Sequence, residues 1–402
     1  IAEVTCIGGG GQGGCSARGG TGVHNTTGGG AGGFSRKRIA IKAGDTFTVV
    51  VGAGGNDANQ SPNNSGSEED GNDGGESTFT NDTAISTIAL DSNGGIKGIA
   101  NQTTTASGAT YAGGAGGTAS GGDVNYTGGR GGTITRSNNA PNSGSIATGG
   151  GAVAINGVAY NGGDVAYNSS TNLACATGGA GIGGNGGSVT TNANQAISAC
   201  GTAGGSASQA GRGLSSTQAA NAGNTAQSFG ATDDYGVKSL YNPAGVPSYG
   251  GFGLGQSANA FGPAGRGGDG FTPSNATFAS FNARDPSYGN TNSSLMGLPS
   301  RSTTVGYENV YFGPGGGGGG CVYVGTTTNH TSAGGSGAIF GGGGALLDNC
   351  GFIQAGNSGA SMNGKGGFGG GSGGFKQGYN STNSSTLWAG GGNGVVIIQY
   401  LG

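Results

Sequence analysis

Runs of glycine constrain this chain more than any other feature of its sequence. The longest is an unbroken row of six glycines between Pro314 and Cys321, and 103 of the 402 residues are glycine. Glycine loses the most backbone entropy on folding, and a glycine-rich sequence without a strict repeat is usually disordered. An ordered fold would have to place these glycines where a Cβ atom would clash.

Three features of the composition argue for order. Charged residues make up only 8% of the chain, 14 phenylalanines and 13 tyrosines are spread along it, and the six cysteines form an even set. Disordered chains are usually highly charged and poor in aromatic residues. Collagen is excluded, because it needs glycine at every third position and abundant proline, whereas only 9 prolines are present.

The glycine-rich texture between Gly113 and Gly394 excludes most regular structure. Each interior glycine costs a helix about 1 kcal/mol relative to alanine, and glycine offers a strand no side chain for cross-strand packing. The remaining ordered form is the extended helix with three residues per turn, which makes no internal hydrogen bonds. We therefore expect packed polyglycine-II helices joined by loops. For the six-glycine row, the alternative is a flexible linker.

Strand signals cluster toward the two ends of the chain. The predicted strands are residues 1–8, 36–55, 76–92 and 394–401, and the second range contains a turn at Ala43-Gly44-Asp45 that makes it a hairpin. Val395 to Ile398 is a continuous apolar run, which indicates a central strand covered on both faces. We expect the two terminal strands to share one antiparallel sheet with the strand at Phe47 to Val51.

The predicted fold class is therefore all-β, within a single domain over residues 1–402. The terminal segments would form an antiparallel, β-sandwich-like framework. Residues 105–392 would be glycine-rich insertions that contain the polyglycine-II helices and long loops.

Charge and hydropathy exclude several partners. The net charge is −3 with 15 Lys and Arg residues, so we expect no nucleic-acid partner, which would need a basic surface. No apolar stretch approaches the roughly 18 residues needed to cross a bilayer, so we expect no membrane insertion. The N-terminal sequence lacks the basic and apolar regions of a signal peptide, which indicates a processed end or export without a signal.

The cysteines favour disulfides over a metal site. None of their spacings matches the paired CxxC pattern of zinc sites. Disulfides would place the protein in an oxidising, extracellular setting. The candidates are Cys6, Cys15, Cys175, Cys200, Cys321 and Cys350, with Cys175–Cys200 and Cys321–Cys350 as the local pairs among 15 connectivities that six cysteines allow.

No motif predicts an enzyme or a bound cofactor. Glycine triplets that resemble a dinucleotide-binding loop arise from composition alone here, and neither His24 nor His330 has a neighbouring nucleophile or metal ligand in the sequence. The acidic stretch Ser67 to Glu76 is most simply a solvated loop. Its carboxylates make calcium the one conceivable cofactor, with the candidate ligands Glu68, Asp70, Asp73 and Glu76.

Four blocks of the sequence resemble a known family, the glycine-rich domains of bacteriophage tail-fibre and tail-tip proteins and of some bacterial surface proteins. The blocks occur in the family's order, at Val4 to Gly14, Ile41 to Gly55, Gly74 to Phe79 and Gly390 to Tyr400. The resemblance implies a β-sandwich-like framework that serves assembly or attachment. The cysteines and the Asn-, Ser- and Thr-rich middle depart from typical phage members, which favours a free-standing extracellular or virion-surface subunit.

Two functions are consistent with these observations. In the first, the chain is a non-enzymatic structural subunit that self-assembles into a homo-oligomer, fibre or filament, because its terminal strands could pair with a neighbouring copy. In the second, it is an adhesin or tail-fibre receptor-binding module for a host-surface glycan or protein. Aromatic side chains could then stack on sugars, or else fill gaps between glycine layers, and the candidates are Tyr249, Phe252, Tyr379 and Trp388.

Overall fold

All the regular elements that the computed structural model describes are β-strands. The described residues are 1–16, 23–55, 68–82, 88–103, 108–137, 144–168, 173–190, 197–202, 204–205, 227–229, 253–257, 316, 320–323, 337, 340–348, 366–376 and 390–401. Within them there is no helix, and hence none that is long and apolar enough to cross a membrane. The prediction of an all-β chain is confirmed for this part.

The strands are short and numerous. Their bounds are β1 Ala2–Ile7, β2 Cys15–Ser16, β3 Val23–Thr26, β4 Phe34–Ile39, β5 Phe47–Val50, β6 Glu68–Glu69, β7 Ser77–Asn81, β8 Ala89–Ser92, β9 Ala100–Thr103, β10 Thr110–Tyr111, β11 Ala119–Ser120, β12 Val124–Tyr126, β13 Ile134–Arg136, β14 Gly144–Ala147, β15 Val165–Tyr167, β16 Leu173–Ala176, β17 Val189–Thr190, β18 Ile197–Gly201, β19 Gln227–Phe229, β20 Gly253–Ser257, β21 Gly320–Tyr323, β22 Leu346–Asp348, β23 Phe375–Lys376 and β24 Val395–Tyr400.

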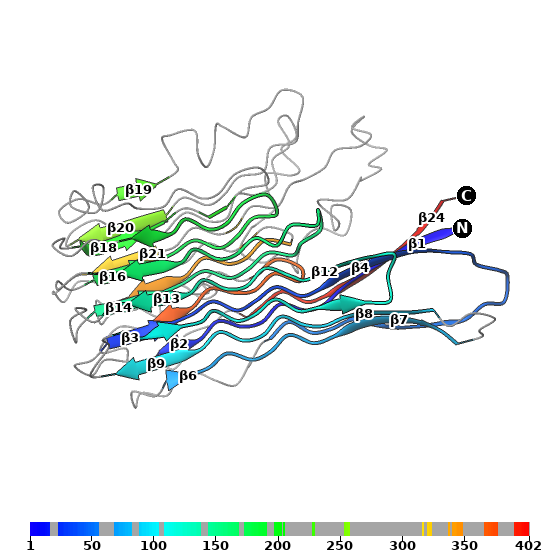
Figure 1. Ribbon diagram of the computed structural model, residues 1–402, viewed down its shortest axis with the longest axis horizontal. Coiled ribbons are helices and arrows are strands. Elements are labelled where there is room, and N and C mark those ends of the chain that lie inside the picture. Colours follow the sequence, from blue (N-terminus) through cyan, green and yellow to red (C-terminus); the bar gives the residue numbers. More distant parts are fainter. Residues whose placement is uncertain are drawn as a thin grey trace, which may run out of the picture.

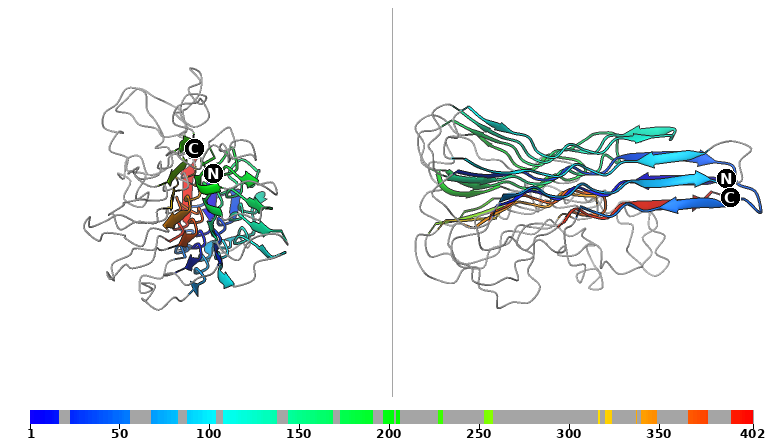
Figure 2. Two further views of the ribbon diagram at one scale, coloured as in Figure 1. Left: turned by 90° about the vertical axis from the view of Figure 1, so that its left-hand side faces the viewer. Right: turned by 90° about the horizontal axis from the view of Figure 1, so that it is seen from below.

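The described part is elongated, with strands at both ends and extended glycine-rich segments between them (Figure 1). Strands β1, β4, β7 and β24 lie at the end that carries both termini, and β3, β9, β14, β16 and β18 lie at the opposite end. In the end-on view of Figure 2, the described segments lie side by side in layers. The described segments thus run along the long axis of the molecule many times.

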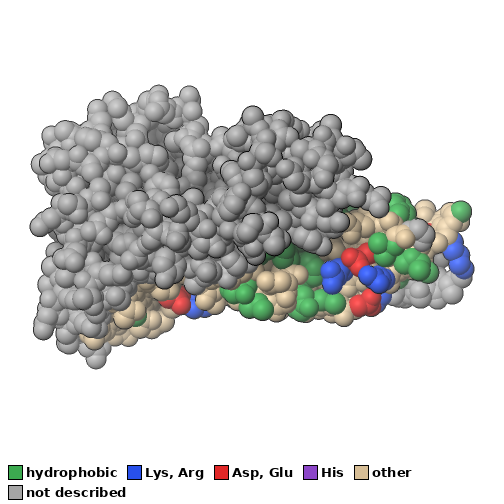
Figure 3. Space-filling view, turned by 90° about the horizontal axis from the view of Figure 1, so that it is seen from above, with side chains coloured by type: hydrophobic (Ala, Val, Ile, Leu, Met, Phe, Trp, Pro, Cys, Tyr) green, Lys and Arg blue, Asp and Glu red, His purple; other side chains and the backbone are tan. Residues whose placement is uncertain are grey.

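Two four-stranded antiparallel sheets occupy the end with the termini. The terminal sheet has the order β12-β4-β1-β24, and the companion sheet has the order β11-β8-β7-β5. One hydrophobic cluster contains side chains of both sheets, including Val4 and Cys6 of β1 and Phe79 and Leu90 of β7 and β8. Figure 3 shows a compact group of charged side chains among hydrophobic ones toward this end.

The structure corrects two expectations about this end. Strands β1 and β24 pair as predicted, but β24 is the last strand of its sheet and not a central one. Strand β5 belongs to the companion sheet, and β4 pairs with β1 and β12, so the predicted hairpin is a crossover between sheets. The turn itself is confirmed, because Gly44 adopts a φ of 93° that favours glycine.

Between the two ends, backbone hydrogen bonds repeat with a period of three residues. Successive residues from Gly8 onward donate to different segments, and in two of the three series every third residue returns to the same segment. In the first series, the N–H groups of Gly8, Gly11 and Gly14 bond to Gly33, Gly30 and Thr27. In the second, those of Gly9 and Gln12 bond to Gly75 and Asn72. In the third, Gly10 bonds to Gly392 and Gly13 bonds to the Ser372 Oγ. Each pass is therefore bonded to neighbours on several sides, unlike a strand in a sheet.

Glycine is required in these segments because the neighbouring backbones lie too close for a Cβ atom. A Cβ on Gly10 would collide with the carbonyl of Gly370, and one on Gly371 would collide with that of Gly29. Gly316, in the six-glycine row, donates to the Gly205 carbonyl and faces the Gly179 carbonyl in the same way. At this position the row is part of the packed body, so the linker alternative is wrong there.

Gly10→Ala should therefore destabilise the fold by about 3 kcal/mol or more, because the clash is with backbone that cannot rotate away. Gly44→Ala is the matched control: its Cβ would meet nothing within 4 Å, so only the positive φ is penalised, at about 1 kcal/mol. Chemical denaturation of both variants measures the difference. Equal losses of stability would contradict the close packing described here.

The opposite end contains mixed sheets in which most neighbouring strands are parallel. Their orders are β10-β13-β15-β17, β18-β16-β14-β3-β9 and β19-β20-β21-β22-β23-β2-β6. A hydrophobic cluster formed by side chains of the first two sheets includes Ile134, Ile146, Val165 and Val189. The antiparallel framework predicted from the sequence is thus confined to part of the fold, because equivalent passes of the chain run in the same direction.

Buried threonines connect successive passes at this end. Thr177 follows β16, and its hydroxyl accepts a hydrogen bond from Gly149 N at 3.1 Å and donates one to the Gly163 carbonyl at 2.6 Å. Thr148 and Thr202, after β14 and β18, make the same pair of bonds with other glycines. A hydroxyl can do this because it is both donor and acceptor.

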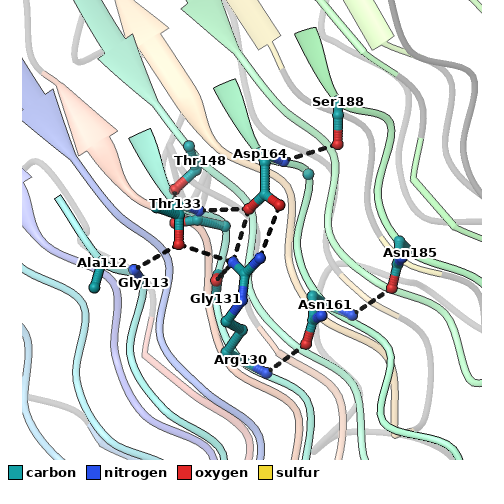
Figure 4. A network of polar contacts seen from close by, with 12 residues as sticks. Ala112, Gly113, Arg130, Gly131, Thr133, Thr148, Asn161, Asp164, Asn185 and Ser188 are labelled. Carbon is teal, nitrogen blue, oxygen red and sulfur yellow. Dashed lines mark hydrogen bonds and ion pairs between the residues drawn. The ribbon is translucent and has the colours of Figure 1, made fainter. Parts of the chain in front are cut away.

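A second series of polar side chains connects the returning passes (Figure 4). Asn161 Oδ1 accepts from Arg130 N at 3.0 Å, and Asn185 Oδ1 accepts from Asn161 N at 2.7 Å. Three residues further on, Asp164 accepts from Thr133 N, and Ser188 accepts from Asp164 N. Each pass thus caps backbone N–H groups of the preceding one, and the spacing of three matches the period of the glycine segments.

Thr177→Val should lower the free energy of unfolding by about 2–3 kcal/mol, because it leaves a buried N–H and a buried carbonyl without their partner. Thr190→Val is the control, since Thr190 is exposed on β17, and it should change stability by less than about 0.5 kcal/mol. Thermal unfolding compares the two variants. A neutral Thr177→Val would show that water or a shifted backbone replaces the hydroxyl.

Candidate functional site

Carboxylates of the acidic stretch bond to the segment that contains Lys97 and Ala100. Asp73 Oδ1 accepts from Lys97 N at 2.8 Å, Asp70 Oδ1 accepts from Ala100 N at 3.0 Å, and Asp70 Oδ2 lies 3.4 Å from Lys97 Nζ. Glu68 faces His24, with 3.6 Å between Oε1 and Nδ1, and Glu76 is exposed. Among the described residues, no three acidic, histidine or cysteine side chains converge on one point, so the four calcium candidates are not brought together.

Cys6, Cys15 and Cys175 are buried free thiols, so the predicted disulfides are not formed at these positions. Cys175 lies in register with Cys200, its predicted disulfide partner, on the neighbouring parallel strand, but its thiol is free. The side chains of Cys200 and Cys321 and the whole of Cys350 lie outside the described part. Cys6 and Cys15 cannot pair with each other, because they lie in strands of different sheets at opposite ends of the extended Gly8 to Gly14 segment.

The thiols of Cys6 and Cys15 should resist alkylation in the folded protein. Burial, with Asp91 nearby, raises the pKa of Cys6 to about 12, and burial raises the pKa of Cys15 well above its usual value. The reactive thiolate is therefore scarce at neutral pH. Iodoacetamide labelling followed by peptide mass spectrometry should modify both cysteines only after unfolding in guanidinium. Labelling of either one in the folded state would contradict the burial, and failure to label after unfolding would reveal a disulfide.

The described histidine is part of a closed polar cluster. Its Nδ1 lies 2.7 Å from the Ser16 hydroxyl. Both side chains are buried, at 2% exposure for His24 and 0% for Ser16. Arg136 is also buried, donates from Nε to Asn25 Oδ1, and has its pKa lowered to about 10 by burial. These buried contacts connect strands of different sheets: Ser16 and His24 join β2 to β3, and Arg136 and Asn25 join β13 to β3.

One exposed feature is the side of the molecule on which β24 ends the terminal sheet and β5 ends the companion sheet. Gly394 N bonds to the Gly52 carbonyl, and Gly391 N bonds to the Gly55 carbonyl. The two segments are therefore antiparallel neighbours in the glycine region. Beyond Gly52 and Gly394 they separate, and β5 enters the companion sheet while β24 enters the terminal sheet. We call the surface formed by β5 and β24 the open edge.

Apolar side chains on the open edge face inward and yet are exposed to solvent. Val49 is in register with Phe79, and Ile398 is in register with Val4, so each lies on the face of its sheet that contributes to the shared cluster. Their exposed fractions are nevertheless 44% for Val49 and 42% for Ile398, and that of Tyr400 is 77%. The cluster is therefore not closed on this side.

Neither strand of the open edge carries a charged residue, since β5 reads FTVV and β24 reads VVIIQY. Most natural edge strands are protected by charge, proline or a bulge, because their free N–H and C=O groups can pair with another strand. The sequence signal was present in these uncharged apolar runs. A strand covered on both faces and an unprotected edge strand can both consist of such a run, so the apolar pattern alone did not distinguish them.

The predicted glycan-binding aromatics, Tyr249, Phe252, Tyr379 and Trp388, lie outside the described residues. The site is defined by backbone and by apolar side chains alone.

In its described part, the chain is an all-β, glycine-rich fold whose extended passes are packed backbone to backbone. Residues 1–213 match the family model for the glycine-rich domain, and because this is more than half of the chain, the protein belongs to that family. No curated protein matches the sequence.

Proposed function

We propose that the chain is a non-enzymatic structural subunit of an extracellular or virion-surface fibre. The observation that carries the proposal is the three-residue period of hydrogen bonds, in which consecutive residues such as Gly8, Gly9 and Gly10 bond to different neighbouring segments. A body connected in this way resists bending and shearing in more than one direction. Such stiffness suits a spacer or fibre.

We interpret these segments as polyglycine-II helices and the two terminal sheets as a β-sandwich. The period of three residues and the negative φ angles of most described glycines support the first assignment. The hydrophobic cluster shared by the terminal and companion sheets supports the second. In this interpretation the sandwich anchors one end of a polyglycine-II rod.

The proposal assigns no reaction to the described polar clusters. Ser16, His24 and Arg136 are buried, and their contacts connect strands. Location on a virion or cell surface rests on the resemblance of four sequence blocks to phage and bacterial surface proteins. The adhesin alternative rests on aromatic residues outside the described part and stays a prediction.

Negative-stain microscopy of native or purified protein over a range of concentrations tests the proposal. We expect rods or filaments whose subunits have their long axes aligned, because the stiff body is elongated. Monodisperse monomers at every concentration would contradict a fibre subunit. Hydrogen exchange supplies an independent check, since the amides of Gly8 to Gly14 should be among the best protected in a rigid body.

A further inference from the structure

We infer that the open edge binds the open edge of a second copy of this chain, with β24 of each copy pairing antiparallel with β5 of the other. The inference rests on the proposed function, because it names the surface through which two subunits would pair within a fibre. Two copies would be related by a two-fold axis parallel to the strands.

The opposite directions of β5 and β24 make the edge self-complementary. Gly394 and Gly391 bond to Gly52 and Gly55 in reverse order, so β24 and β5 leave the glycine region antiparallel to each other. Rotation about an axis parallel to the strands preserves strand direction. Strand β24 of one copy can therefore lie beside β5 of its partner as an antiparallel neighbour, and the same contact forms a second time across the axis.

This pairing would close the cluster that is open in one copy. Val49, Ile398 and Tyr400 are on inward faces but 44%, 42% and 77% exposed. In the pair, the partner's strand extends each sheet and its inward side chains cover these residues. The contact would also satisfy the free backbone groups of both edge strands. Because β5 and β24 carry no charge, no like charges would oppose each other.

A different protein that adds a single strand would be the competing occupant. It would extend one sheet and leave the other edge free, whereas a second copy satisfies both at once. The absence of charge on either strand also offers a foreign partner no electrostatic feature to recognise. The observations therefore favour self-pairing.

The test compares sedimentation velocity of the full chain with that of the variant Val49→Lys/Ile398→Lys over a concentration series. The control is Ile96→Lys/Val158→Lys, whose apolar side chains are similarly exposed, at 45% and 50%, but lie outside the open edge. We expect the wild type and the control to form dimers. The edge variant should raise the dimer dissociation constant by about 100-fold or more, because the contact would bury lysines without partners.

If the lysine variant fails to fold, Val49→Thr/Ile398→Thr replaces it, since threonine keeps the strand propensity and should weaken the dimer by about tenfold. Equal dimerisation of edge variant, control and wild type would overturn the inference. Fibres that persist unchanged in the edge variant would leave the proposed function standing and refute this surface. A wild type that forms neither dimers nor fibres would refute both.

Discussion

The hydrogen bond between backbones that touch without side chains is the interaction on which the structure depends. At Gly10 and Gly371, a neighbouring carbonyl occupies the space that a Cβ atom would fill. The backbones can approach closely enough to bond only because these residues have no side chain. Each such bond contributes only about 1 kcal/mol net, while glycine starts with an unusually large entropic cost. Many bonds per pass, distributed over several directions, are needed to offset it.

Conventional hydrophobic packing completes the fold where the glycine segments end. The cluster around Val4 and Phe79 ties the terminal and companion sheets together, and the cluster around Ile146 and Val165 connects two sheets at the opposite end. Between them, Phe34, Val153 and Phe340 belong to a third cluster. Aromatic and branched side chains thus occupy the positions where the backbones diverge, because a separated pair of passes leaves space that only a side chain fills.

The sequence predicted what depends on local pattern. It located β1, β24 and the turn at Gly44, because strand patterns and turn chemistry are encoded within a few residues. It could not place β24 at an edge, since neighbours in a sheet are set by segments hundreds of residues away. The polar caps could have been predicted from the sequence. Thr177, Asn185 and Ser188 lie in one stretch whose T-G-G and N-G-G-S motifs have counterparts in neighbouring passes. The sequence of the acidic stretch could not show its role, because carboxylates that cap backbone N–H groups and carboxylates that bind calcium have the same composition.

The period of three also determines which changes of length the molecule can accept. In a three-residue turn, one inserted residue rotates every later N–H by about 120°, so each donor in the Gly8 to Gly14 pass would point at the wrong neighbour. An insertion of three residues restores the direction but shifts the pass along its axis, out of register with the partners of its N–H groups. Insertions and deletions should therefore be tolerated in the turns that join passes, while the glycine runs keep their length. The molecule can become thicker or thinner only by the gain or loss of a whole pass.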